Sequence, residues 1–149
     1  MITKIIVVSN SRLKYGIETY LKDKKFFTIS ITNPEDDDEF GSSKTTLNLK
    51  FHDADRSLSN ELIDFHKLKL FDGNHADQLI SFINQIDENK TEDYLLLHSK
   101  EGNSRAATIA TWLRDYLGFK KVDDIVFCFE QGKRLNENKE ISEVLRKAI

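Results

Sequence analysis

The chain has 149 residues, of which 39% are hydrophobic and 32% charged, a balance typical of one soluble globular domain with its own core. Its formal net charge of −3 disfavours broad binding to nucleic acid or to membrane surfaces, because both usually require a basic face. The single cysteine, Cys128, excludes an internal disulfide and favours a reducing, cytoplasmic compartment.

The first third of the chain contains three predicted strands. Ile2–Ser9 is short and rich in β-branched residues, which predicts a buried strand rather than a signal peptide or a membrane span. Apolar residues at helical spacing predict a helix over residues 13–21, and Phe26–Thr32 is the next predicted strand. Residues 45–53 alternate between apolar and polar side chains, which predicts a third strand that ends at Asp53.

The rest of the chain continues the alternation of helices and strands. The segment from Arg56 to Leu70 has no clear periodicity and suits a short helix or a covering loop. Further on, a strand is predicted over residues 94–98, and helices over 74–87, 104–117, 122–131 and 141–148. This alternation predicts a single α/β domain over residues 1–149, with a mostly parallel central sheet of about four to five strands flanked by helices on both faces.

Between the strand over 94–98 and the helix over 104–117 lies a polar loop with a glycine near its middle. It reads His98-Ser99-Lys100-Glu101-Gly102-Asn103-Ser104-Arg105. Backbone N–H groups at a helix start lack partners inside the helix, and the helix dipole favours negative charge there. Gly102 permits a tight turn, and the Arg105 guanidinium can donate two parallel hydrogen bonds to a tetrahedral oxyanion. The loop therefore predicts a phosphate-binding site.

This loop resembles the signature His-Cys-x-x-Gly-x-Ser-Arg of the cysteine-dependent protein tyrosine phosphatases and dual-specificity phosphatases, with serine where the cysteine belongs. Residues 27–34, 49–55 and 76–83 are similar to blocks that small bacterial and phage-type members carry in the same order. The resemblance extends along the chain, although the segment from Arg56 to Leu70 looks inserted.

The resemblance implies a role for each residue of the loop. Ser99 stands at the position of the nucleophile, where a thiolate attacks phosphorus and forms a cysteinyl-phosphate. Arg105 binds the phosphoryl oxygens and stabilises the transition state, and His98 orients the loop. Ala106 departs from the family, which often has Ser or Thr there to assist release of the thiolate. The implied phosphate-binding set is Ser99, Lys100, Glu101, Gly102, Asn103, Ser104 and Arg105.

Serine at position 99 decides the expected activity. An alcohol is far less acidic than a thiol, and the sequence offers no dedicated base for Ser99. The chain is therefore expected to bind phosphate and to hydrolyse little or none. One explanation is an engineered Cys→Ser substitution that traps substrate; the other is a natural pseudophosphatase that binds phosphotyrosine or another phosphorylated ligand. The intact loop, Arg105 and a candidate acid favour the engineered form.

The family also uses an aspartic acid, on a loop after a strand, that protonates the leaving group and then activates water. Asp53 continues the alternation of residues 45–53 and is the preferred candidate. Asp55 has the same parity and follows directly. Asp72 is a third candidate, although its position just before the predicted helix over 74–87 is typical of a helix cap.

Phosphotyrosine-bearing proteins are the favoured partners, because the chain lacks the dense basic loop expected for inositol phosphates or RNA. Phosphate or sulfate is expected to bind in the loop, whereas no nucleic acid, membrane, metal ion or cofactor is expected to take part. The protein is expected to be a monomer. A rhodanese-like sulfurtransferase, whose loop also cradles an anion, is a weaker alternative, because Arg105 and Asp53 fit a phosphatase better.

Overall fold

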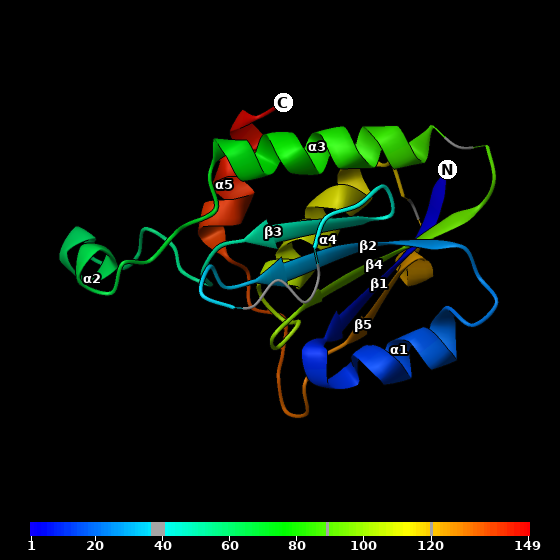
Figure 1. Cartoon of the computed structure of the whole chain (residues 1–149), viewed down its shortest axis with the longest axis horizontal. Coiled ribbons are helices and arrows are strands. Elements are labelled where there is room, and N and C mark those ends of the chain that lie inside the picture. The colour runs from blue at the N-terminus through cyan, green and yellow to red at the C-terminus, as the bar shows by residue number, and fades with distance from the viewer. Residues whose placement is uncertain (37–40, 89, 120) are drawn as a thin grey trace.

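A central sheet of five parallel strands organises the computed structural model, which describes residues 1–36, 41–88, 90–119 and 121–149 (Figure 1). The strands are β1 (Ile2–Ser9), β2 (Phe26–Thr32), β3 (Thr46–Lys50), β4 (Asp93–Ser99) and β5 (Ile125–Cys128). Their spatial order is β3-β2-β4-β1-β5, so the predicted phosphate loop follows the middle strand. The predicted α/β fold with a mostly parallel sheet is confirmed.

Helices cover both faces of the sheet (Figure 1). They are α1 (Leu13–Tyr20), α2 (Asn60–Phe65), α3 (Gly73–Asp87), α4 (Arg105–Tyr116) and α5 (Lys139–Lys147), with short 3-10 turns η1 (Asn10–Arg12) and η2 (Val122–Asp124). α1 packs on one face, whereas α3, α4 and α5 pack on the other. α2 extends away from the body of the protein. No helix among the described residues is both long and apolar enough to cross a bilayer.

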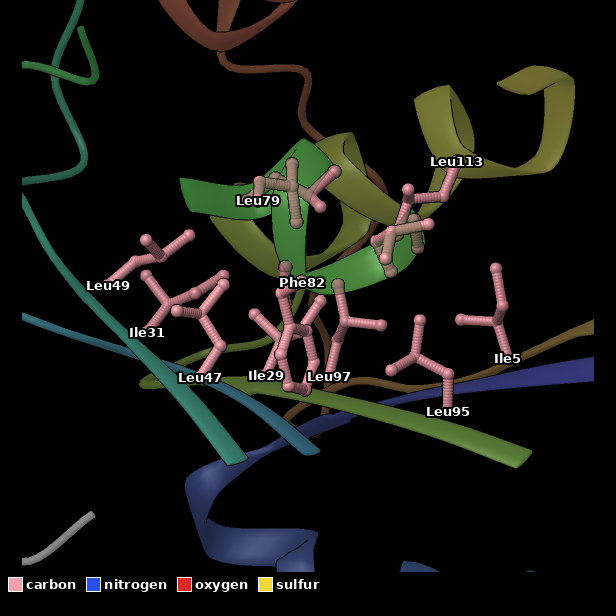
Figure 2. Packing of buried hydrophobic residues seen from close by; sticks show 14 of the residues in the cluster. Ile5, Ile29, Ile31, Leu47, Leu49, Leu79, Phe82, Leu95, Leu97 and Leu113 are labelled. Carbon is pink, nitrogen blue, oxygen red and sulfur yellow. The ribbon is translucent and has the colours of Figure 1, made fainter. Parts of the chain in front are cut away.

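The larger core lies between the sheet and the three helices α3, α4 and α5. Figure 2 shows Ile29 and Leu97 of the sheet directed toward Leu79 of α3, and all three side chains are fully buried. Burial of such an aliphatic side chain contributes about 1.5–3 kcal/mol relative to exposure. A smaller cluster under α1 fills the opposite face, and its buried members are Ile6, Val8, Leu21 and Leu96. The two clusters hold the sheet rigid from both sides.

Several boundaries from the sequence need correction. The helix predicted over residues 122–131 is wrong: this stretch forms η2 and then the edge strand β5, which pairs with β1. A run of only four strand residues is too short for periodicity to distinguish helix from strand. The third strand ends at Lys50 rather than at Asp53, although its alternation continues to the buried Phe51. The segment from Arg56 to Leu70 contains the short helix α2.

The core assignment predicts a contrast between two leucines. Leu79→Ala should lower the free energy of unfolding by about 2–5 kcal/mol, because it removes buried methyl groups and leaves a cavity. Leu62→Ala on α2 is the matched control, since Leu62 is 47% exposed, and its effect should stay within about 0.5 kcal/mol. Urea unfolding followed by circular dichroism measures both. Similar losses in the two variants would contradict this account of the core.

Candidate active site

The predicted phosphate loop forms the floor of a cavity of about 320 Å³ at the carboxyl ends of the strands. This edge of a parallel sheet is where ligands commonly bind in α/β proteins. All of the loop residues from Ser99 to Arg105 line the cavity. The other lining residues are Asn33, His52, Asp53, Ala54, Leu58 and Leu68. The structure therefore brings the predicted loop and the preferred acid candidate, Asp53, into one cavity.

Hydrogen bonds from neighbouring segments hold the loop carbonyls on its outer side. The Lys100 carbonyl accepts from the N–H of Asn10 at 3.2 Å, and the Glu101 carbonyl accepts from the N–H of Glu130 at 3.3 Å. The Asn103 carbonyl accepts from the N–H of Asn136 at 2.8 Å. In a trans peptide the N–H points opposite to the carbonyl of the preceding residue. The N–H groups of residues 101, 102 and 104 are thus turned away from these supports.

These N–H groups are free to bind an anion. Within the described part of the chain, the amides of Glu101, Gly102 and Ser104 donate to no acceptor. They stand immediately before α4, whose N-terminus carries a partial positive charge. Successive amides that face one point form an anion-binding concavity. The loop therefore has the geometry of an oxyanion cradle.

Gly102 is the residue on which this curvature depends. Its φ of +78° lies in the left-handed region that other residues avoid. A Cβ placed there would lie 2.7 Å from the backbone nitrogen of Ser9 and 2.8 Å from the carbonyl carbon of Val8. Glycine is therefore required twice, by backbone conformation and by the close approach of the loop to the end of β1.

Arg105 is fixed at the start of α4 and is only 5% exposed. Its Nη1 donates to Asn33 Oδ1 and to the Phe51 carbonyl, both at 2.8 Å. Its Nε and Nη2 donate to no acceptor in the described residues, so one edge of the guanidinium remains for a ligand. Burial lowers the pKa of Arg105, and the nearby carboxylates, foremost Asp53, act in the opposite direction. An arginine keeps its charge under such a shift, so the cavity has a buried cation.

His98 supports the loop from below as a neutral imidazole. Its side chain is nearly fully buried, and this burial lowers its pKa to about 4. Nδ1 lies 2.8 Å from Asn10 Oδ1, and a neutral ring can make this bond only by donating from Nδ1. The bond joins the carboxyl ends of β4 and β1. His98 thus links the loop to the end of β1 without adding positive charge near neutral pH.

Ser99 lies at the end of β4 and is 2% exposed. Its hydroxyl makes no hydrogen bond with any described residue, and in particular none with an imidazole, carboxylate or amine. A serine needs such a partner to become a nucleophile. Among the described residues, the geometry therefore has a cradle around Ser99 but no base hydrogen-bonded to its hydroxyl.

Asp53 follows β3 and reaches the loop through its side chain. Its Oδ1 accepts a hydrogen bond from the Ser104 hydroxyl at 2.8 Å and another from Asn138 Nδ2 at 3.0 Å. The residue is exposed to solvent. Of the three acid candidates, Asp53 is the one that lines the cavity with Ser99 and Arg105.

The other two aspartates belong to separate local structures. Asp55 accepts hydrogen bonds from the hydroxyl and the N–H of Ser57, and these bonds lower its pKa. Asp72 caps α3 by accepting from the N–H groups of Asn74 and His75 at 3.0 and 3.2 Å. Neither residue lines the loop cavity. Asp72 has the capping role suggested by its position in the sequence.

Three asparagines contribute contacts that the sequence did not reveal. Asn10 binds His98, Asn33 holds Arg105, and Asn138 binds Asp53. Each pair is separated by more than 70 residues, so no local spacing indicates it. The only local signal was the position of Asn138 before an amphipathic stretch, which is typical of a helix cap.

Comparison with family models, with curated proteins and with solved structures finds no match for this chain. Among the described residues, no group of three or more His, Cys, Asp or Glu side chains is arranged to hold a metal ion.

The role of Gly102 can be tested against a second left-handed glycine. Gly118 has a φ of +75° but open space around it, so Gly118→Ala should lose only the conformational cost of roughly 1–2 kcal/mol. Gly102→Ala should lose about 1–3 kcal/mol more, because its methyl group meets the backbone of β1. Thermal unfolding of both variants measures the difference. Equal losses would show that the loop does not need this close approach.

Proposed function

We propose that this protein is a phosphate-binding member of the tyrosine and dual-specificity phosphatase class, with its nucleophile replaced by Ser99. Three loop amides, which have no acceptor among the described residues, line one cavity with the buried Arg105 and with Ser99, and this arrangement carries the proposal because it suits a tetrahedral dianion beside residue 99. Asp53 in the same cavity supplies the acid that phosphoryl transfer to a thiol would need.

With cysteine at position 99, the chemistry would proceed in two steps. The thiolate sulfur attacks phosphorus, a phosphorus–sulfur bond forms, and the bond from phosphorus to the ester oxygen breaks. Asp53 gives its proton to the departing oxygen and becomes a carboxylate. This carboxylate then takes a proton from water, whose oxygen attacks phosphorus and releases inorganic phosphate and the thiolate. The amides and Arg105 stabilise the charge on the three phosphoryl oxygens in both steps.

With serine at position 99, the first step lacks a competent nucleophile. The chain as given then binds a phosphoryl group and retains it, which is the behaviour of a substrate-trapping form. We favour an engineered Cys→Ser origin because the cradle and Asp53 are otherwise complete. In the native enzyme a reducing, cytoplasmic compartment would keep the catalytic thiol from oxidation. The alternative is a natural pseudophosphatase that acts as a phosphotyrosine-binding module, and the lack, among the described residues, of a base hydrogen-bonded to Ser99 is compatible with both.

The walls of the cavity favour an ester with an apolar leaving group. Leu58, Leu68 and Ala54 line the cavity together with the polar loop. An aromatic ring can rest against such side chains, whereas a highly phosphorylated inositol or an RNA chain would need further cations. We therefore propose a phosphotyrosine-bearing protein as the partner.

Restoring the nucleophile should restore hydrolysis. Ser99→Cys is expected to hydrolyse an aryl phosphate at least about 10³-fold faster than the chain as given, because a thiolate in this cradle needs no separate base. Release of phosphate from 4-nitrophenyl phosphate measures this, with Ser99→Ala as the inactive control. Hydrolysis by all three proteins would contradict the trapped form. Hydrolysis by none would favour the binding module.

The acid can be assigned in the Ser99→Cys background. Adding Asp53→Ala should lower kcat for phenyl phosphate, whose leaving group needs a proton, by about 10²–10⁴-fold, the usual contribution of a general acid. Binding of phosphate, measured by calorimetry, should change little, because the amides and Arg105 remain. Asp55→Ala is the matched control and should retain activity, since Asp55 binds Ser57 outside the cavity. The reverse result would move the assignment to Asp55.

A further inference from the structure

The side chain of Asn138 makes hydrogen bonds through both of its polar atoms, Oδ1 and Nδ2. Asn138 lies 85 residues from Asp53 in the sequence. It is 3% exposed and immediately precedes α5. Its Oδ1 accepts from the N–H of Ile141 at 3.1 Å and thus caps that helix. Its Nδ2 donates to Asp53 Oδ1 at 3.0 Å and to the Ala54 carbonyl at 3.2 Å. Both hydrogens of the amide are therefore used, and the amide has one orientation.

The backbone of Asn138 is held as firmly as its side chain. Its N–H donates to Thr108 Oγ1 of α4 at 2.9 Å. The loop that forms the floor of the cavity ends at Arg105, the first residue of α4, so Asn138 is hydrogen-bonded to the helix that directly follows the loop. Asn138 is thus hydrogen-bonded to α4, to α5 and to the segment after β3. Through these bonds, the position of the loop can affect the position of the Asp53 side chain.

This arrangement determines which oxygen of Asp53 carries the proton. Oδ1 accepts two hydrogen bonds, from Asn138 Nδ2 and from the Ser104 hydroxyl. An oxygen whose lone pairs already accept two donors is a poor place for a proton. Oδ2 has no partner among the described residues, so the proton of the acid form belongs on Oδ2. Removing the Asn138 donor would leave the carboxyl group held by the Ser104 hydroxyl alone, and it could then rotate more easily about its Cβ–Cγ bond.

We propose that Asn138 is the positioning residue for the acid Asp53, holding its Oδ1 so that Oδ2 presents the proton to the leaving group. This inference rests on the proposed function, in which Asp53 is the acid. Asn138 then has two separable roles: its Oδ1 caps α5, and its Nδ2 donates to Asp53. Serine and aspartate cap helices about as well as asparagine, but neither can supply the Nδ2 donor.

The experiment compares two esters in the Ser99→Cys background. The nitrophenolate of 4-nitrophenyl phosphate leaves readily without a proton, whereas the phenolate of phenyl phosphate depends on the acid. With Asn138→Ser, kcat/KM for phenyl phosphate should fall by about 10–100-fold, while kcat/KM for 4-nitrophenyl phosphate should fall less than about 3-fold. Asn138→Asp should show the same preference for the activated ester.

Two further variants separate positioning from simple loss of structure. Leu145→Val weakens the packing of α5 without touching Asp53, and it should leave the ratio of the two esters unchanged. Asn138→Ser added to Asp53→Ala should lower the rate no further, because both changes remove the same function.

Equal losses on both esters in the Asn138 variants, or a changed ratio in Leu145→Val, would overturn the positioning role while leaving the proposed function intact. A lack of hydrolysis in Ser99→Cys itself would instead overturn the proposed function and this inference together.

Discussion

The close contact between the loop and the end of β1 is the constraint on which the site depends. Gly102 lies against the backbone of Val8 and Ser9 at distances that no side chain would permit. The Lys100 carbonyl accepts from the Asn10 amide, and the His98 imidazole binds the side chain of the same asparagine. These contacts fix the peptide planes of the loop, and the direction of its amides follows from those planes. The cradle is thus a property of two neighbouring parallel strands rather than of the loop alone.

The charges of the cavity are arranged around one buried cation. Arg105 loses the solvation of water, and Asn33 and the Phe51 carbonyl replace part of it with fixed dipoles. Carboxylates at positions 35, 36, 53 and 101 surround it and partly compensate its charge. Glu101 is also paired with Lys133 at 3.5 Å, and that pairing weakens its repulsion of an anion. A dianion entering the cavity would be attracted by Arg105 and the amides and repelled by the carboxylates of Asp53 and Glu101, which line the same cavity.

The sequence was most informative about features that depend on residues close together in the chain. The order of strand, glycine loop and helix around Ser99 and Arg105 follows from residue types within one short stretch, and the structure has these elements there. The alternation through Leu47, Leu49 and Phe51 placed Asp53 near the correct sheet edge. The sequence of β5 predicts a helix wrongly, because a four-residue edge strand is too short to show a period of its own. Asn138 could not be related to Asp53 because 85 residues separate them, and only the packing of α5 beside α4 brings them together.

The site can exist only when β1 is paired with β4. The register joins Val8 to His98 and Ser9 to Ser99, partners about 90 residues apart in the chain. Closing so long a loop is entropically unfavourable before the intervening elements have packed. The cradle therefore exists only where these two strands are paired, and a chain without that pairing has no cradle to hold an anion. Any ligand of the cradle binds the native state alone. By mass action it would therefore raise the free energy of unfolding of the whole domain.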